Sequence, residues 1–266
     1  MNNNEILKKI LFEEHITEYG IVDTDSLIYQ KEYLLKNKDN FKNCIVLCIP
    51  YRTQNNNPDN FSKYAATQDY HLYTTELFKR LYVSFSKVFP KDTFVGFADH
   101  SPINERDAAF KANLGFIGKN SMLINKRYGS YIFIASIFTT LSLEISSFSE
   151  KHCCNCGKCL EACPSGALKS NFENCLSYIT QKKNKTNIEI NIMKNNKSVW
   201  GCDICQDVCP HNSNAEYSPI PFFNNNIINH LTSDLINNMS EEEFIKRAFA
   251  WRGRKIILEN LSYFNE

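Results

Sequence analysis

The chain has 266 residues, a formal net charge of +1 and 43% hydrophobic residues. This length suits one large domain or two small ones, and the near-neutral charge argues against a uniformly basic nucleic-acid binder, although not against a local basic patch. The opening residues, MNNNEILKKIL, lack the apolar core of a secretory signal, and no apolar run reaches the roughly 18 residues of a membrane span. We therefore expect a cytoplasmic protein without membrane contact.

Residues 1–149 are predicted to mix helices and strands in one compact α/β or α+β domain. Apolar residues recur with helical spacing in some segments and form short buried runs in others. The predicted helices are residues 2–20, Thr67–Val88 and a segment that ends at Gly115; the predicted strands are Cys44–Ile49, Phe94–Ala98 and Tyr131–Thr140. Because Cys44 and Cys48 alternate along the first strand, we expect both in the core.

The rest of the chain divides into two predicted parts. Residues 150–215 are rich in cysteine and indicate a ferredoxin-like domain, in which the polar, basic stretch 181–197 is expected to form an exposed hairpin or loop. Residues 216–266 predict a short helical tail, where Ser240 and Glu243 have the spacing of a capping box. The predicted fold class is α+β: a mixed α/β domain, a two-cluster ferredoxin-like domain and a helical tail.

The stretch HCCNCGKCLEACP, residues 152–164, carries the most specific signal in the chain. The spacing C-x2-C-x2-C-x3-C-P is typical of a loop that binds a cubane iron–sulfur cluster through three thiolates, while its fourth cysteine ligates a second cluster. A second run, WGCDICQDVCP, follows at residues 200–210. Eleven cysteines without a secretory signal favour metal ligation over disulfides, and structural zinc prefers separated C-x2-C pairs.

We therefore predict two [4Fe–4S] clusters with eight cysteine ligands. The ligands predicted for the first cluster are Cys153, Cys156, Cys159 and Cys209, and those for the second are Cys163, Cys175, Cys202 and Cys205. Cys154 would break the spacing of the first run, so we expect it to be a bystander.

Two clusters alone only conduct electrons, so the first domain must serve a further purpose. Asp99 ends the strand Phe94–Ala98, and a carboxylate at a strand end beside a pocket is well placed to deliver a proton. Asp99 could equally cap the helix that starts near Pro102, because Asp is a favoured capping residue. Both interpretations stay open on spacing alone.

The segment around Lys119, Asn120 and Ser121 follows two glycines and predicts a turn that presents polar groups to a ligand, or a plain loop. No G-x-G-x-x-G follows a strand and no P-loop is present, so a Rossmann dinucleotide site is unsupported.

Several motifs in order resemble the epoxyqueuosine reductases, a family of tRNA-modifying enzymes. They are KYAATQDYH, ADHSPINERDAAFKANLGFIGKNSMLI, HCCNCGKCLEACPSGAL, CLSYIT and WGCDICQDVCPHN, and they extend from about Lys63 to Asn212, more faintly to Trp251–Leu261. The family pattern D-x-x-P-x-x-E-R corresponds to Asp99, Pro102, Glu105 and Arg106, and its L-G-[WF]-x-G-K-N to Leu114 to Asn120.

The resemblance implies a cobalamin- and iron–sulfur-dependent reductase. Such an enzyme converts epoxyqueuosine at the wobble position of tRNA into queuosine, the last step of queuosine biosynthesis, with two electrons, two protons and release of water. It further implies that cobalamin lies between the first domain and the clusters, and that Asp99 is the proton donor above the corrin. The candidate cobalamin contacts are Asp99, Lys119, Asn120, Ser121, Ser177, Tyr70 and His71.

The partners implied are tRNA with a queuosine-type anticodon and an external electron donor of the flavodoxin or ferredoxin type, and we expect a monomer. Many family members continue into a helical-repeat domain that helps to hold tRNA, so a short form is expected here. The basic residues proposed to contact phosphates are Lys182, Lys183, Lys185, Arg247, Arg252, Arg254 and Lys255, each of which could also be an ordinary solvated charge.

Two alternatives remain open. One is a related corrinoid and iron–sulfur reductase of a small molecule, similar to the reductive dehalogenases. The other is a ferredoxin-type electron carrier, which would bind clusters without cobalamin.

Overall fold

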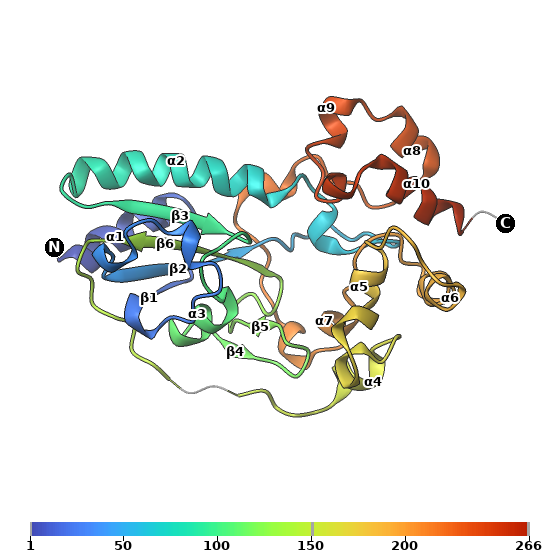
Figure 1. The fold of residues 1–266 in the computed structure, drawn as a ribbon, viewed down its shortest axis with the longest axis horizontal. Coiled ribbons are helices and arrows are strands. Elements are labelled where there is room, and N and C mark those ends of the chain that lie inside the picture. The colour runs from blue at the N-terminus through green and yellow to red at the C-terminus, as the bar shows by residue number, and fades with distance from the viewer. Residues whose placement is uncertain (1, 150–151, 265–266) are drawn as a thin grey trace. The chain divides into compact units, whose positions relative to one another are not determined.

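The computed structural model describes residues 2–149 and 152–264, and Figure 1 shows the course of the chain. The chain forms two compact units. The first comprises Met1–Pro50 with Tyr73–Cys154, and the second comprises Tyr51–Leu72 with Asn155–Glu266. Each unit therefore contains two separate stretches of sequence. In the part of the chain that the structure describes, no helix is long and apolar enough to cross a membrane.

The first unit is built on a four-stranded antiparallel sheet with the strand order β1-β2-β6-β3. Its strands are β1 (Tyr19–Asp23), β2 (Asn43–Pro50), β6 (Ile132–Thr139) and β3 (Phe94–Ala98). A separate hairpin pairs β4 (Phe116–Ile117) with β5 (Leu123–Ile124). The three predicted strands correspond to β2, β3 and β6, whereas β1 and the hairpin were not predicted.

The central strand β2 is buried on both faces, because helices cover the sheet from both sides. Cys44, Val46 and Cys48 belong to one core cluster, which also contains Ala108 and Ala109 of helix α3 (Glu105–Lys111). The alternate residues point to the other face, as the two-residue period of a strand requires. Both cysteines have no exposed surface, which confirms the prediction that they are core residues.

Two more helices complete the first unit. α1 (Asn3–Glu13) begins with a capping box between Asn2 and Glu5 and is shorter than the predicted 2–20, because the chain turns at His15, whose φ is 61°. α2 (Tyr70–Val88) runs along one face of the sheet (Figure 1). A Cβ at Gly96 of β3 would lie 2.7 Å from the ring of Phe78, so the glycine allows this close packing.

The second unit consists mainly of short helices and turns. Its helices are α4 (Lys158–Ala162), α5 (Leu176–Ile179), α6 (Asn187–Asn195), α7 (Ile204–Asp207), α8 (Ser233–Asn238), α9 (Glu241–Phe244) and α10 (Arg254–Ser262). The fully buried Trp200 and Phe249 belong to a core cluster of this unit. The predicted capping box of Ser240 and Glu243 is confirmed at the start of α9.

The prediction of a hairpin or loop over 181–197 is wrong. This segment contains α6, which begins with a capping box between Thr186 and Glu189 and buries Met193 completely. The many asparagine residues of the segment concealed a helix that is held by its cap and by one buried side chain.

The two units do not follow the predicted domain boundaries at 149 and 215. The segment 51–72 packs with the second unit, where the N–H of Ser62 donates to the carbonyl of Trp200 at 2.7 Å and Phe61 forms a bridge with Trp200. Residues 216–266 also belong to that unit, since Asn260 donates side-chain hydrogen bonds to the carbonyls of Thr180 and Val199.

Candidate functional site

The cysteines of the second unit are carried by short helices that contact each other. Cys159 lies in α4 and Cys163 ends that helix, while Cys205 lies in α7 and Cys209 follows it. α4 and α7 are in contact (Figure 1). The two cysteine runs, which are far apart in the sequence, are therefore brought together within this unit.

Four thiol groups lie close enough to influence one another electrostatically. Burial, together with the charges of Asp203, Cys175 and Cys163, raises the pKa of Cys202 to about 12, although a hydrogen bond from the amide of Ile204 acts against this. Burial likewise raises the pKa of Cys205 to about 12, together with the charges of Cys202, Cys175, Asp203 and Cys163. These four cysteines are the ones predicted to ligate the second cluster. As thiolates they would need compensating positive charge, which a metal cluster supplies.

The sulfur of Cys163 lies in a concave turn of backbone N–H groups. Burial acts to raise its pKa, but hydrogen bonds from the amides of Leu168, Ser165 and Ala167 and from the Ser165 hydroxyl lower it below the ordinary value. Gly166, with a φ of 67°, provides the left-handed residue in this turn. A thiolate stabilised by backbone amides is suited to ligate a metal cluster, because such hydrogen bonds also tune its potential.

Within residues 2–149 and 152–264, no group of three or more His, Cys, Asp or Glu side chains is arranged to hold one metal ion. The fit to an iron–sulfur cluster rests instead on the four neighbouring thiols and on the amide-stabilised sulfur of Cys163.

The remaining cysteines of the first run differ in exposure. Cys153 is half-buried and Cys154 is exposed, and both lie at the end of the stretch that belongs to the first unit. Cys156 is exposed and Cys159 is half-buried.

Asp99 lies directly after β3, and its side chain is exposed. Its φ of 59° places it in the left-handed region, and the N–H of Ser101 donates to its carbonyl at 2.9 Å. The cap of α3 is Asn104, whose side chain accepts a hydrogen bond from the N–H of Asp107. The alternative that Asp99 caps this helix is therefore wrong. A polar residue held in a sparsely populated conformation at a strand end is typical of a functional site.

His100 is directed to a lysine: the ammonium group of Lys31 lies 3.2 Å from its Nδ1. This contact orients the imidazole ring next to Asp99.

The predicted turn after Gly118 connects β4 to β5 in the first unit. Lys119 and Ser121 are exposed, whereas Asn120 is buried and its Oδ1 accepts a hydrogen bond from the N–H of Met122. Asn120 thus stabilises the turn itself, and Lys119 and Ser121 are the residues that the turn presents to solvent. A Cβ at Gly118 would lie 2.6 Å from Oδ1 of Asn120 and 2.8 Å from Cδ1 of Ile124, so the glycine allows this close packing.

The other three candidate contacts lie in the second unit. The N–H and the Nδ1 of His71 both contact Oδ1 of Asp69, at 2.9 and 2.7 Å, and the rings of Tyr70 and His71 are 4.2 Å apart. Ser177 is half-buried in α5, and its carbonyl accepts a hydrogen bond from the Thr180 hydroxyl. His71 is therefore oriented by a neighbouring carboxylate.

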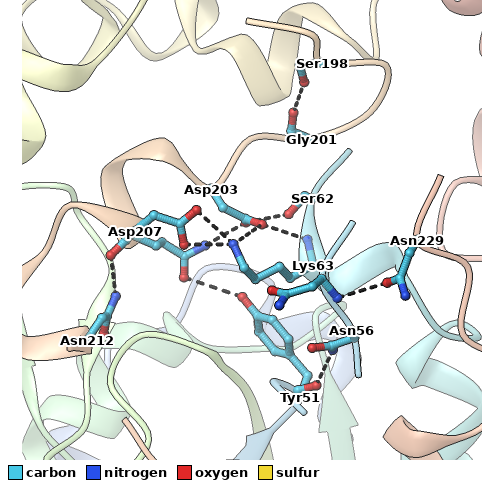
Figure 2. A network of polar contacts seen from close by, with 12 residues as sticks. Tyr51, Asn56, Ser62, Lys63, Ser198, Gly201, Asp203, Asp207, Asn212 and Asn229 are labelled. Atoms are coloured by element: carbon cyan, nitrogen blue, oxygen red, sulfur yellow. Dashed lines mark hydrogen bonds and ion pairs between the residues drawn. The ribbon is translucent and has the colours of Figure 1, made fainter. Parts of the chain in front are cut away.

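Sequence reasoning missed a polar network beside the second cysteine run (Figure 2). Lys63 forms ion pairs with Asp203 and Asp207, and Asp203 also accepts a hydrogen bond from the hydroxyl of Ser62. The signal was present, since Asp203 and Asp207 interleave with the cysteines of CDICQDVC, but their partner lies about 140 positions earlier in the chain.

The comparisons of this sequence with known proteins agree with one another. Residues 152–212 match the family model of a 4Fe-4S double cluster binding domain. An epoxyqueuosine reductase of Leadbetterella byssophila is 31% identical over 223 residues, which are 79% of this chain and 74% of the relative. One of Lactococcus garvieae is 32% identical over 213 residues, 76% of this chain, and the match spans 60% of the relative's length.

Solved structures show the same fold. The epoxyqueuosine reductase from Streptococcus thermophilus has a TM-score of 0.83 at 24% identity, over 99% of this chain and 81% of that chain. An epoxyqueuosine reductase solved with an epoxyqueuosine-modified tRNA stem loop has a TM-score of 0.80 at 23% identity, covering 98% and 80%. A catabolic reductive dehalogenase has a TM-score of 0.56 at 16% identity, covering 79% and 32%.

Proposed function

Because the chain belongs to the epoxyqueuosine reductase family, we propose that it reduces epoxyqueuosine to queuosine at the wobble position of tRNA, using two [4Fe–4S] clusters and cobalamin. The likeness to the Leadbetterella byssophila relative carries this proposal. Its 223 aligned residues exceed the length of either compact unit, so the likeness extends beyond the cysteine runs into the first unit.

In this proposal, the cysteine-rich residues 150–215 conduct electrons, and the part of residues 1–149 that carries the sheet forms the cobalamin-binding catalytic domain. The segment 51–72 and the helical tail 216–266 pack within the second unit. The convergence of Cys163, Cys175, Cys202 and Cys205 supports the second cluster. The first cluster would be held by Cys153, Cys156, Cys159 and Cys209. The electrons come from an external donor of the flavodoxin or ferredoxin type.

Asp99 is the proposed proton donor. Opening the epoxide and forming the alkene consumes two electrons and two protons, and the epoxide oxygen leaves as water. The position of Asp99 on the surface at the end of β3 supports this role, because a substrate can reach a side chain there. Lys31, through His100, would help to fix the backbone turn that presents the carboxyl.

Cobalamin, when bound, would supply the strong reductant that breaks the carbon–oxygen bond of the epoxide. In the first unit, Lys119 and Ser121 are the residues best suited to bind its polar side chains, since both are exposed on a turn that Asn120 stabilises. Tyr70, His71 and Ser177 of the second unit remain further candidates. The contact with Asp69 fixes the ring of His71, so this side chain would meet the cofactor in one orientation.

Among the basic residues proposed to bind tRNA, most already have partners within the protein. Arg247 donates to the Asn226 carbonyl, and Lys182 and Arg254 pair with Glu189 and Glu241. Lys183 and Lys255 are exposed, and the guanidinium of Arg252 lies 4.2 Å from the ring centroid of the exposed Trp251. An exposed aromatic ring beside a cation is suited to stack on an unpaired base. We therefore propose that Trp251, Arg252 and Lys255 contribute most to tRNA binding.

The test is to purify the protein without oxygen, add cobalamin, and count iron and cobalt while recording an EPR spectrum. About eight irons and one cobalt per chain are expected. The loaded protein is then given a reductant and tRNA that contains epoxyqueuosine, and nucleosides are analysed by mass spectrometry for queuosine.

The outcomes separate the three functions. Clusters without bound cobalt would favour an electron carrier. Both cofactors without any queuosine formed would contradict the tRNA reaction and direct attention to a small substrate, as in the reductive dehalogenases.

A further inference from the structure

The polar network of Figure 2 is centred on Lys63, which is largely buried. Its ammonium group lies 2.8 Å from both carboxylate oxygens of Asp207 and 3.7 Å from Oδ2 of Asp203. The side chain of Asp203 is also largely buried, whereas that of Asp207 is half-exposed. A single cation is therefore held between two carboxylates.

The network fixes the backbone on both sides. Asp203 accepts hydrogen bonds from the Ser62 hydroxyl at 2.6 Å, from the Lys63 N–H at 2.7 Å and from the Gln206 amide at 3.1 Å. Gln206 in turn accepts one from the Tyr51 hydroxyl at 3.4 Å. The segment 51–63 is thus joined to α7 through several polar contacts that are shielded from water.

These charges lie beside two of the proposed cluster ligands. Asp203 directly follows Cys202, and its charge acts on both Cys202 and Cys205. Lys63, Asp203, Asp207 and Cys202 also line one small pocket of about 140 Å³. Burial increases the effect of Lys63 and Asp203 on their neighbours, because little water is present to screen these charges, whereas the half-exposed Asp207 is screened more.

We propose that Lys63 is a positioning residue for the second cluster, and that its charge, together with the charges of Asp203 and Asp207, sets the reduction potential of that cluster. The inference rests on the cluster assignment of the proposed function. The potential of an iron–sulfur cluster depends on the net charge around it and on its solvent exposure. Groups beyond the ligands commonly orient and tune a metal site in this way.

The charges give variants with opposite expected effects. Lys63→Met removes a positive charge, so adding an electron becomes harder and the midpoint potential of one cluster becomes more negative. Asp207→Asn removes a negative charge from the same network, so the potential of that cluster becomes more positive. Lys63→Arg keeps the charge and should remain close to the wild type.

The measurement is a potentiometric titration of anaerobically reconstituted full-length protein, followed by EPR, with iron counted in each variant. Lys246→Met is the matched control, because it breaks an ion pair with Glu242, 2.8 Å long, that lies on an exposed helix turn. This control should shift neither cluster.

Opposite shifts of one cluster in Lys63→Met and Asp207→Asn support the inference, since a purely structural role would not reverse its sign. Equal potentials in all variants, or shifts in the same direction, would overturn it. If Lys63→Met loses iron, Asp207→Asn and Lys63→Arg still decide the matter. A wild-type protein that binds no iron–sulfur cluster would instead refute the proposed function.

Discussion

Arg106 donates a hydrogen bond of 2.6 Å to the backbone carbonyl of Ser121. The contact joins α3 to the turn between β4 and β5, and Ser121 has a left-handed backbone with a φ of 62°. Two motifs that are separate in the sequence are therefore one structural feature. The arginine of the first motif holds the backbone of the turn that presents Lys119.

Loss of this bond should loosen the turn. We expect Arg106→Ala to lower the affinity for cobalamin, with a stability loss of no more than about 1 kcal/mol, because the bond is exposed. The affinity is measured by titration of the visible spectrum of cobalamin, and stability by chemical denaturation. Arg80→Ala, which breaks the exposed pair with Glu14, is the control and should bind cobalamin like the wild type. Equal affinity in both variants would separate Arg106 from the cofactor site.

Substitution of Asn104 should affect stability, whereas substitution of Asp99 should affect turnover. Asn104→Ala removes the cap of α3 and should cost about 1 kcal/mol of unfolding free energy. Asp99→Asn should leave the unfolding free energy and both cofactors unchanged, yet abolish queuosine formation. Urea denaturation and the nucleoside assay measure the two effects. Full turnover by Asp99→Asn would remove this carboxyl group from the mechanism.

Two glycines of the first unit should respond differently to alanine. A Cβ at Gly115 would lie 2.2 Å from the backbone oxygen of Ile124, whereas one at Gly96 would meet only the ring of Phe78 at 2.7 Å. Backbone cannot move aside as a side chain can, so Gly115→Ala should lower the melting temperature more than Gly96→Ala. Thermal denaturation followed by circular dichroism measures both. The reverse order would show that the hairpin β4–β5 adapts to the added methyl group.

Cys154 and Cys156 make a matched pair, because both are exposed and only one fits the cluster spacing. Cys154→Ser should retain the full iron count, whereas Cys156→Ser should lose the iron of the first cluster. Iron analysis and EPR after anaerobic reconstitution provide the measurement. Iron loss in Cys154→Ser with retention in Cys156→Ser would reverse the ligand assignment.

Removal of the clusters should loosen the second unit locally. α4, α5 and α7 have only four or five residues each, too few for a stable helix without added contacts. We therefore expect a chelator to increase hydrogen exchange in these helices by an order of magnitude or more, as metal binding is coupled to folding. The helix α10, which packs Ile257 and Leu261 into the Trp200 core, should keep its protection and serves as the internal control. If hydrogen exchange in α4, α5 and α7 is the same before and after chelation, these helices do not depend on the clusters.

Local sequence patterns were sufficient for the parts of the fold that depend on local chemistry. The alternation in β2 and the capping box of α9 could be recognised because each depends on neighbouring residues. The sequence did not decide whether Asp99 caps α3, because the true cap, Asn104, lies a few residues later in the same polar segment.

The features that were missed depend on distant partners. Lys63 is one basic residue among many in the sequence, and only the fold places it between Asp203 and Asp207. α6 was missed for a related reason, because a single buried residue, Met193, ties it to its core cluster. Neither contact leaves a periodic signal in the sequence.

The segment 51–72 has a consequence for how the protein is made. Tyr64 accepts a hydrogen bond from the indole of Trp200, 136 positions later, so this segment is synthesised long before its partner. Neither unit can be obtained by a single cut of the chain, because each contains two separate stretches. A nascent chain must therefore carry Phe61 and Ala65 without their core until the last helices emerge. Slow, late completion of folding during synthesis is the expected result.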